Sequence, residues 1–186
     1  MPGADIPCVS TTLLLSQRKV MEDLVGAHVV TRALSRLPDE VRIAYEGIVP
    51  LSWFPVAWFN DVVTAVATEA GGNVLAFHAE VLHTNAERTV SKLWRVFLRF
   101  TSDEALMSRT PVLYSRSYTQ GELTAKFRGP GRMEVTLRGW PDVPDIQVQV
   151  VKVGVGTVLK FAGRKHLHVT ADRRPTGALF TATWRP

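Results

Sequence analysis

The first half of the chain alternates apolar and polar positions with the period of an α-helix. One segment begins after Ser10, the expected N-cap, and stops at Gly26. A second spans residues 28–37 and ends at Pro38. A third follows Pro55, and its apolar stripe comprises Phe59, Val62, Val63, Val66 and Ala67. This pattern predicts a helical N-terminal part.

The strongest amphipathic pattern runs from Ala86 to Phe100. One face is apolar and comprises Val90, Leu93, Trp94 and Phe97. The opposite face is basic and comprises Arg88, Lys92, Arg95 and Arg99. This basic surface is typical of a solvated helix face, and its functional alternative is a site for acidic groups. A short helix is expected over 103–108, capped by Ser102.

After Pro111 the period changes to two, which is typical of β-strands. Residues 122–127 and 132–138 alternate, and Gly129-Pro130-Gly131 supplies a tight turn between them. We therefore expect an antiparallel hairpin with one solvated face. Two more strands are expected around 167–171 and 180–184.

The stretch from Ile146 to Phe161 fits two structures. Its β-branched residues favour a strand by propensity. Its length, the preceding Pro144 and the following Gly163 also suit a helix that crosses the sheet. Either way the chain is predicted to be an α+β single domain over 1–186. Its helical part covers about 10–110, and an antiparallel sheet of about four strands covers about 115–186.

Composition excludes several classes of protein. The chain has 186 residues, 46% of them hydrophobic, which is enough for one core. Cys8 is the single cysteine, so neither an internal disulfide nor a multi-thiolate zinc site can form. The longest uncharged apolar stretch, 47–60, is too short to span a bilayer. No leader pattern opens the chain, and a cytoplasmic location is expected.

Charge is distributed unevenly along the chain. Residues 1–87 carry 5 basic and 10 acidic groups, a net of −5. Residues 88–186 carry 17 and 7, a net of +10. Such a split is typical of a surface for nucleic acid or anionic membrane, or of two halves that dock within a monomer or between two copies.

The sequence carries no recognisable catalytic or cofactor motif. It lacks a phosphate-binding G-x-x-x-x-G-K-[ST] loop, a G-x-S-x-G elbow, H-E-x-x-H and C-x-x-C. His166 and His168 share one face of an expected strand, without a third ligand nearby. We therefore expect no metal, no cofactor and no catalytic residue.

An aromatic segment lies beside Pro50 and Pro55. It comprises Trp53, Phe54, Trp58 and Phe59. Core packing explains most such clusters, and the alternative is a contact surface or the mouth of an apolar pocket.

The order of several short motifs carries a resemblance that covers nearly the whole chain. They are Leu13-Leu14-Leu15, Leu37-Pro38-Asp39-Glu40-Val41-Arg42, Pro50-Leu51-Ser52-Trp53-Phe54-Pro55, Leu98-Arg99-Phe100, Pro111-Val112-Leu113-Tyr114, Tyr118-Thr119-Gln120-Gly121 and Phe180-Thr181-Ala182-Thr183-Trp184. The chain resembles a paralogous family of uncharacterised myxobacterial proteins. That family is similar to the haem–nitric-oxide-binding (H-NOX) superfamily, with its 4-vinyl-reductase-like and TRAPP-like domains.

The resemblance implies a helical N-terminal part followed by an antiparallel sheet with a crossing helix, which would make 146–161 helical. Members of the superfamily are small-molecule sensors, apolar-ligand pockets or dimeric assembly subunits, and seldom enzymes. Haem-binding relatives have a histidine after Pro-Leu and a later Y-x-S-x-R. Here Tyr114 follows Leu113, and no Y-x-S-x-R occurs. We therefore expect no haem.

Our leading hypothesis is a non-enzymatic regulatory or assembly domain, homodimeric through the aromatic segment at Trp53 to Phe59. The alternative is a sensor of a small apolar ligand, with Trp94 and Tyr114 near the pocket. A further alternative is binding of nucleic acid or anionic membrane through the basic C-terminal half, with nucleic acid ranked below the other partners.

Overall fold

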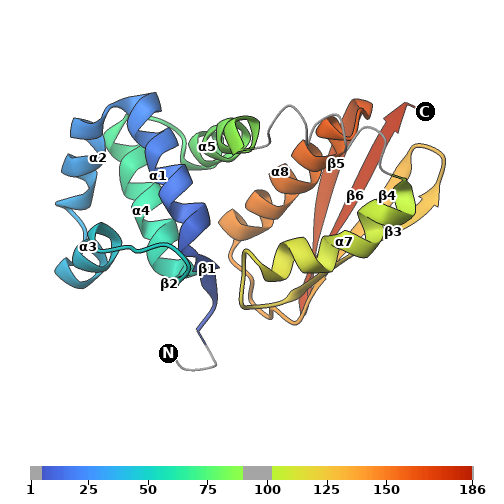
Figure 1. Ribbon diagram of the computed structural model, residues 1–186, viewed down its shortest axis with the longest axis horizontal. Coiled ribbons are helices and arrows are strands. Elements are labelled where there is room, and N and C mark those ends of the chain that lie inside the picture. The colour runs from blue at the N-terminus through green and yellow to red at the C-terminus, as the bar shows by residue number, and fades with distance from the viewer. Residues whose placement is uncertain (1–5, 90–101, 186) are drawn as a thin grey trace. The chain divides into compact units, whose positions relative to one another are not determined.

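The computed structural model describes residues 6–89 and 102–185. The chain divides into two compact units, which are described separately (Figure 1). The helical unit comprises Met1–Asn85 and Ser117–Thr119. The sheet unit comprises Ala86–Arg116 and Gln120–Pro186. The helix before the predicted hairpin thus groups with the sheet.

The helical unit contains five helices and two short strands among its described residues. They are β1 (Cys8–Ser10), α1 (Thr11–Val25), α2 (Ala27–Leu34), α3 (Asp39–Glu46), β2 (Trp53–Pro55), α4 (Val56–Glu69) and α5 (Val74–Thr89), whose residues after Asn85 belong to the sheet unit. Ser10 is the N-cap of α1, and Gly26 ends that helix at a φ of 88°. Both are as the sequence predicts.

Helix α4 forms the centre of this unit. Its apolar stripe, predicted from helical spacing, is buried throughout: Phe59, Val62, Val63, Val66 and Ala67. Helix α2 packs against α4 and α1. Removing these side chains from water supplies the stabilisation of the unit.

Backbone hydrogen bonds hold a distant part of the chain against the helical unit. β1 pairs antiparallel with β2. The Ser10 amide donates to the Ser117 carbonyl at 2.9 Å, and the Thr119 amide donates to the Cys8 carbonyl at 3.0 Å. The Cys8 amide donates in turn to the Thr119 hydroxyl at 2.9 Å. Residues 117–119 therefore belong to this unit although they follow α7 in the chain.

The sheet unit consists of a four-stranded antiparallel sheet with two helices. Its elements are α7 (Asp103–Ser115), β3 (Glu122–Gly129), β4 (Arg132–Arg138), α8 (Asp145–Phe161), β5 (Lys165–Arg174) and β6 (Gly177–Arg185). The strand order is β3-β4-β6-β5. The predicted hairpin, the two closing strands and the α+β class are confirmed.

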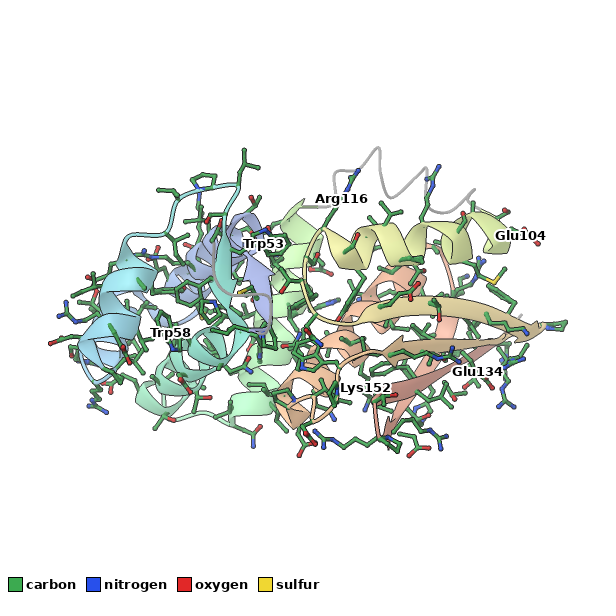
Figure 2. All side chains as sticks on the ribbon, turned by 90° about the horizontal axis from the view of Figure 1, so that it is seen from below. Trp53, Trp58, Glu104, Arg116, Glu134 and Lys152 are labelled. Atoms are coloured by element: carbon green, nitrogen blue, oxygen red, sulfur yellow. The ribbon has the colours of Figure 1, made fainter. Side chains whose placement is uncertain are left out.

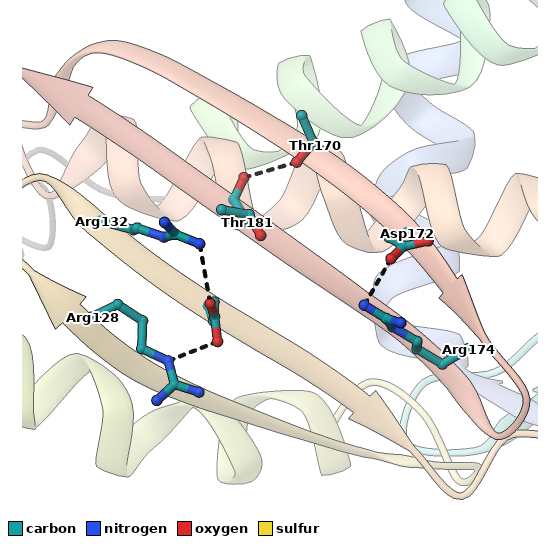
Figure 3. A network of polar contacts seen from close by, with 7 residues as sticks. Arg128, Arg132, Thr170, Asp172, Arg174 and Thr181 are labelled. Atoms are coloured by element: carbon teal, nitrogen blue, oxygen red, sulfur yellow. Dashed lines mark hydrogen bonds and ion pairs between the residues drawn. The ribbon is translucent and has the colours of Figure 1, made fainter.

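The two faces of the sheet differ in polarity, as the period of two predicts. On one face Ala125, Val135, Phe180 and Ala171 lie in register across all four strands. α7 packs on β3, and α8 packs on β5 and β6. The other face carries ion pairs, with the helices behind it (Figure 3). Glu134 accepts from Arg128 at 2.7 Å and lies 3.4 Å from Arg132, and Arg174 lies 2.8 Å from Asp172.

Three elements were left open, not predicted, or predicted too short from the residues alone. Residues 146–161 form α8, as the resemblance implies and against their strand propensity. Helix α5 includes residues 74–85, for which the sequence predicted no helix, and the helix predicted over 86–100 lies outside the described residues from 90 onward. Helix α7 continues past the predicted end at residue 108 to Ser115 and contains Pro111. The helix begins at the Ser102 cap, and the proline removes only one backbone donor, so packing on β3 sustains it.

Gly177 is the position in the sheet unit where a side chain is least tolerated. Its φ is 148°, and an added Cβ would collide with the Leu137 carbonyl on β4. We expect Gly177→Ala to lower the free energy of unfolding by more than about 3 kcal/mol, because strain and collision add. Urea denaturation measures the effect.

Gly154 of α8 provides the matched control. It has open space around it and no positive φ. Gly154→Ala should raise the free energy of unfolding by about 0.5–1 kcal/mol through helix propensity. Equal effects of the two substitutions would contradict the β4–β6 register described above.

Candidate functional site

The four predicted interface aromatics do not share one surface. Trp53 on β2 is 40% exposed, whereas Phe54 and Phe59 are buried in the core at 4% and 5%. The Phe54 ring packs edge-on against Tyr45 at 5.9 Å and against Trp58 at 5.8 Å. Figure 2 labels Trp53 and Trp58 on their two elements. Of the four, Trp53 is the one that is exposed by more than a third.

Exposed apolar side chains do occur beside Trp53. Val49 is 61% exposed and Leu51 is 94% exposed, on the segment that leads into β2. Leu51 also has a φ of 61°, a conformation that bulky residues rarely adopt. We call Val49, Leu51 and Trp53 the apolar loop. Sequence reasoning did not single out Val49 and Leu51, because isolated apolar residues in a loop show no periodicity.

Tyr114, the predicted pocket residue, is 6% exposed near the end of α7. Its hydroxyl donates to the Gln120 carbonyl at 3.0 Å. The Gln120 side-chain amide donates to the Gly139 carbonyl at 2.6 Å. These two hydrogen bonds link the end of α7 to the segments that precede β3 and follow β4.

The predicted basic surface is described only in part. Arg88 is exposed near the end of α5. Trp94, Lys92, Arg95 and Arg99 lie outside the described residues. The role of these residues therefore stays a prediction.

His78 is a candidate functional residue that sequence reasoning missed. It lies on α5, is 3% exposed, and packs edge-on against the Phe59 ring at 5.9 Å. Among the described residues, neither ring nitrogen has a hydrogen-bond partner. Desolvation lowers the pKa of His78 from 6.5 to about 4. The imidazole is therefore neutral at pH 7, with one nitrogen able to donate a hydrogen bond and the other able to accept one.

The helical unit buries further polar atoms that have no hydrogen-bond partner in residues 6–89 and 102–185. They are Gln17 Oε1, the Tyr45 hydroxyl and Asn60 Oδ1. Burial also raises the pKa of Tyr45 far above its usual value, so that group stays protonated. Buried polar atoms normally have a protein or water partner, so each exception calls for a physical reason. In this unit the exceptions come from α1, α3, α4 and α5.

Other reactive groups do not assemble into a site. His166 and His168 are both exposed on β5. Among residues 6–89 and 102–185, no three His, Cys, Asp or Glu side chains are placed to hold a metal ion. Cys8 is buried at 2%, and burial raises its pKa, which disfavours the reactive thiolate. No described helix is both long and apolar enough to cross a bilayer.

Solved H-NOX domains share this fold. A mutant of the T. tengcongensis H-NOX has 17% sequence identity and a TM-score of 0.69, over 95% of this chain and 98% of that one. A mutant Cs H-NOX has 16% identity and a TM-score of 0.70, over 95% and 97%. An oxygen-binding H-NOX domain related to soluble guanylate cyclases has 15% identity and a TM-score of 0.67, over 95% of each chain. No family model and no curated protein matches the sequence. The chain therefore has an H-NOX-like fold.

The residues at the positions implied by the resemblance do not fit haem. A tyrosine that ligates haem iron does so as the phenolate, after its hydroxyl has lost the proton. The Tyr114 hydroxyl, which stands where haem-binding relatives have histidine, donates its proton to the Gln120 carbonyl. The chain also has no Y-x-S-x-R for the propionates. These residues therefore give no support to haem chemistry in this protein.

The depressed pKa of His78 predicts a pH-dependent stability. As pH falls below 6.5 the unfolded chain binds a proton that the folded protein does not accept until about pH 4. The free energy of unfolding therefore keeps its full value above pH 6.5. It falls by about 3 kcal/mol as the pH is lowered from 6.5 to 4. We expect His78→Leu to abolish this part of the urea-unfolding pH profile.

The matched control is His83→Leu, the same change on the same helix. It should keep the wild-type dependence, because it leaves the buried His78 ring in place. Parallel pH profiles for wild type and His78→Leu would show that His78 is not buried in its neutral form.

Proposed function

We propose that this protein is a non-enzymatic sensor module whose helical unit binds a small, largely apolar ligand through His78. The H-NOX-like fold supports a sensor role, since H-NOX domains include one described as oxygen-binding. The observation that carries the proposal is a buried imidazole whose two nitrogens have no hydrogen-bond partner within the described part of the chain.

The energetics of His78 indicate what kind of molecule it would bind. An unsatisfied buried polar group costs about 1–3 kcal/mol, and a ligand that hydrogen-bonds to it recovers that cost. Because the ring is neutral and lies among buried residues such as Phe59, Phe77 and Val81, a charged ligand would be disfavoured. The fitting ligand is a small apolar molecule with one hydrogen-bonding group.

Native mass spectrometry of freshly purified protein tests this proposal. We expect a discrete additional mass on the wild type, with occupancy at least tenfold lower in His78→Leu. His83→Leu should retain the wild-type occupancy. An unliganded wild type, or equal occupancy in His78→Leu, would refute the role of His78. A haem absorption band near 400 nm would refute the proposed ligand class.

The prediction that Tyr114 lines a pocket is tested separately from the His78 site, because Tyr114 lies in the sheet unit. Tyr114→Phe removes only the hydroxyl that donates to Gln120. If Tyr114 lines a ligand pocket within the sheet unit, a mass bound there should be lost more readily from this variant during gentle collisional activation. Unchanged retention would assign Tyr114 a purely structural role.

A second candidate function is homodimeric assembly through the apolar loop. The observation in its favour is the 94% exposure of Leu51 beside the 40% exposure of Trp53. Large apolar side chains gathered on a surface mark protein contacts more often than isolated ones do. Trp is also enriched at interfaces.

Light scattering after gel filtration distinguishes the two candidates. Assembly predicts a dimeric wild type and a monomeric Leu51→Ser/Trp53→Ser variant. Val112→Ser/Leu113→Ser is the control, because those side chains are 51% and 54% exposed on α7. A monomeric wild type, or an unchanged dimer in the first variant, would exclude assembly through the apolar loop.

A further inference from the structure

An open pocket lies at one end of the sheet unit. Its volume is about 390 Å³. The β3–β4 turn at Pro130 forms one side, the junction of α8 and β5 forms another, and the end of β6 completes it. Figure 1 shows these parts near the C-terminus of the chain. Its volume falls within the range of small-ligand pockets, about 300–1,000 Å³.

Two of the lining residues are cations that face each other. Lys165 on β5 and Arg185 on β6 are direct partners in the antiparallel register. Like charges directly opposite each other destabilise a strand pair. Among the described residues neither has an ion-pair partner, and no carboxylate lines the pocket. This arrangement costs stability unless an anion lies between the two side chains.

Elsewhere on the sheet, basic side chains form ion pairs with acidic ones. Arg128 and Arg132 both contact Glu134, and Arg174 pairs with Asp172 (Figure 3). These contacts lie on the same sheet as the pocket. Unpaired opposed cations are therefore a local feature of the pocket and not a general property of this basic unit.

A third cation is held in place beside the first two. The Arg164 guanidinium lies over the Trp184 ring at 5.7 Å, and its Nη1 donates to the Ala162 carbonyl at 3.0 Å. Phe127 packs edge-on against Trp184 at 5.6 Å on the side of the sheet that carries the core. The pocket thus has a fixed aromatic wall and an ordered guanidinium.

The backbone beside Lys165 departs from regular strand geometry. The β5–β6 register shifts between Lys165 and His168. His166, inside that shift, has a φ of 52°. Such irregularities redirect side chains and are over-represented next to binding sites. Here the irregularity immediately follows a pocket cation.

We propose that this pocket binds a phosphate-bearing small molecule. The phosphate oxygens lie between Lys165 and Arg185, and the organic part packs against Pro130 and Trp184. Phosphate fits better than a monocarboxylate, because it offers several acceptor oxygens and more charge to the two opposed cations. This site is in the sheet unit and does not depend on the ligand proposed for His78.

Isothermal titration calorimetry with inorganic pyrophosphate and with AMP tests the proposal. We expect each to bind the wild type with one-to-one stoichiometry and Lys165→Ala/Arg185→Ala to weaken both at least tenfold. Lys126→Ala/Arg138→Ala is the control, since it removes two exposed cations of β3 and β4 outside the pocket. The control should change affinity less than twofold.

A second variant keeps the test independent of folding. Lys165→Glu would place an acid opposite Arg185, so it should raise the melting temperature while abolishing pyrophosphate binding. Absent binding to the wild type, or equal weakening in the control, would overturn the proposal. So would binding to single-stranded oligonucleotides or anionic phospholipid vesicles without binding to pyrophosphate or AMP.

Discussion

The helical unit places an imidazole in an apolar interior, and that burial constrains the elements around it. His78 is 3% exposed, with Phe77 and Val81 on the same helix and Phe59 against its ring. A histidine in such surroundings is neutral and gives up its hydrogen bonds to water. The packing of α4 and α5 must offset this cost. Because burial deprives the imidazole of hydrogen bonds to water, a ligand that supplies such a bond would bind favourably there.

The sheet unit is organised by a different constraint, the separation of its two faces. Apolar residues in register across four strands are covered by α7 and α8. The opposite face matches its basic residues with acids, as Glu134 does for Arg128 and Arg132. Lys165 and Arg185 break this rule at one end. The two proposed ligand contacts therefore differ in chemistry, one apolar with a neutral imidazole and the other cationic.

Strong periodicity made much of the fold predictable. The apolar stripe of α4 and the alternation of apolar and polar residues in β3 and β4 each show which face of the element is buried and which is exposed to solvent. The strands β1 and β2 could not be predicted, because each has three residues and depends on pairing with distant chain. α8 was ambiguous because its β-branched residues suit a strand locally, while its burial against β5 is a tertiary effect.

The candidate site was harder to predict than the fold. Spacing cannot tell a buried aromatic from an exposed one within a short segment, so Phe54 and Trp53 looked alike although only Trp53 is exposed. His78 lies with Phe77 and Val81 on the buried side of α5. From sequence alone, a single polar residue among apolar ones looks like a break in the helical pattern and not like a buried site. The opposed cations needed a strand register, since Lys165 and Arg185 are far apart in sequence.

The most direct test of the central claim is nitrogen NMR of the His78 ring. Long-range ¹H–¹⁵N spectra of the protein as purified are compared with spectra after unfolding, extraction of small molecules and refolding. A ligand contact predicts that at least one His78 ring nitrogen changes shift between the two samples, while the His83 nitrogens do not. Identical His78 shifts in both samples would contradict the account.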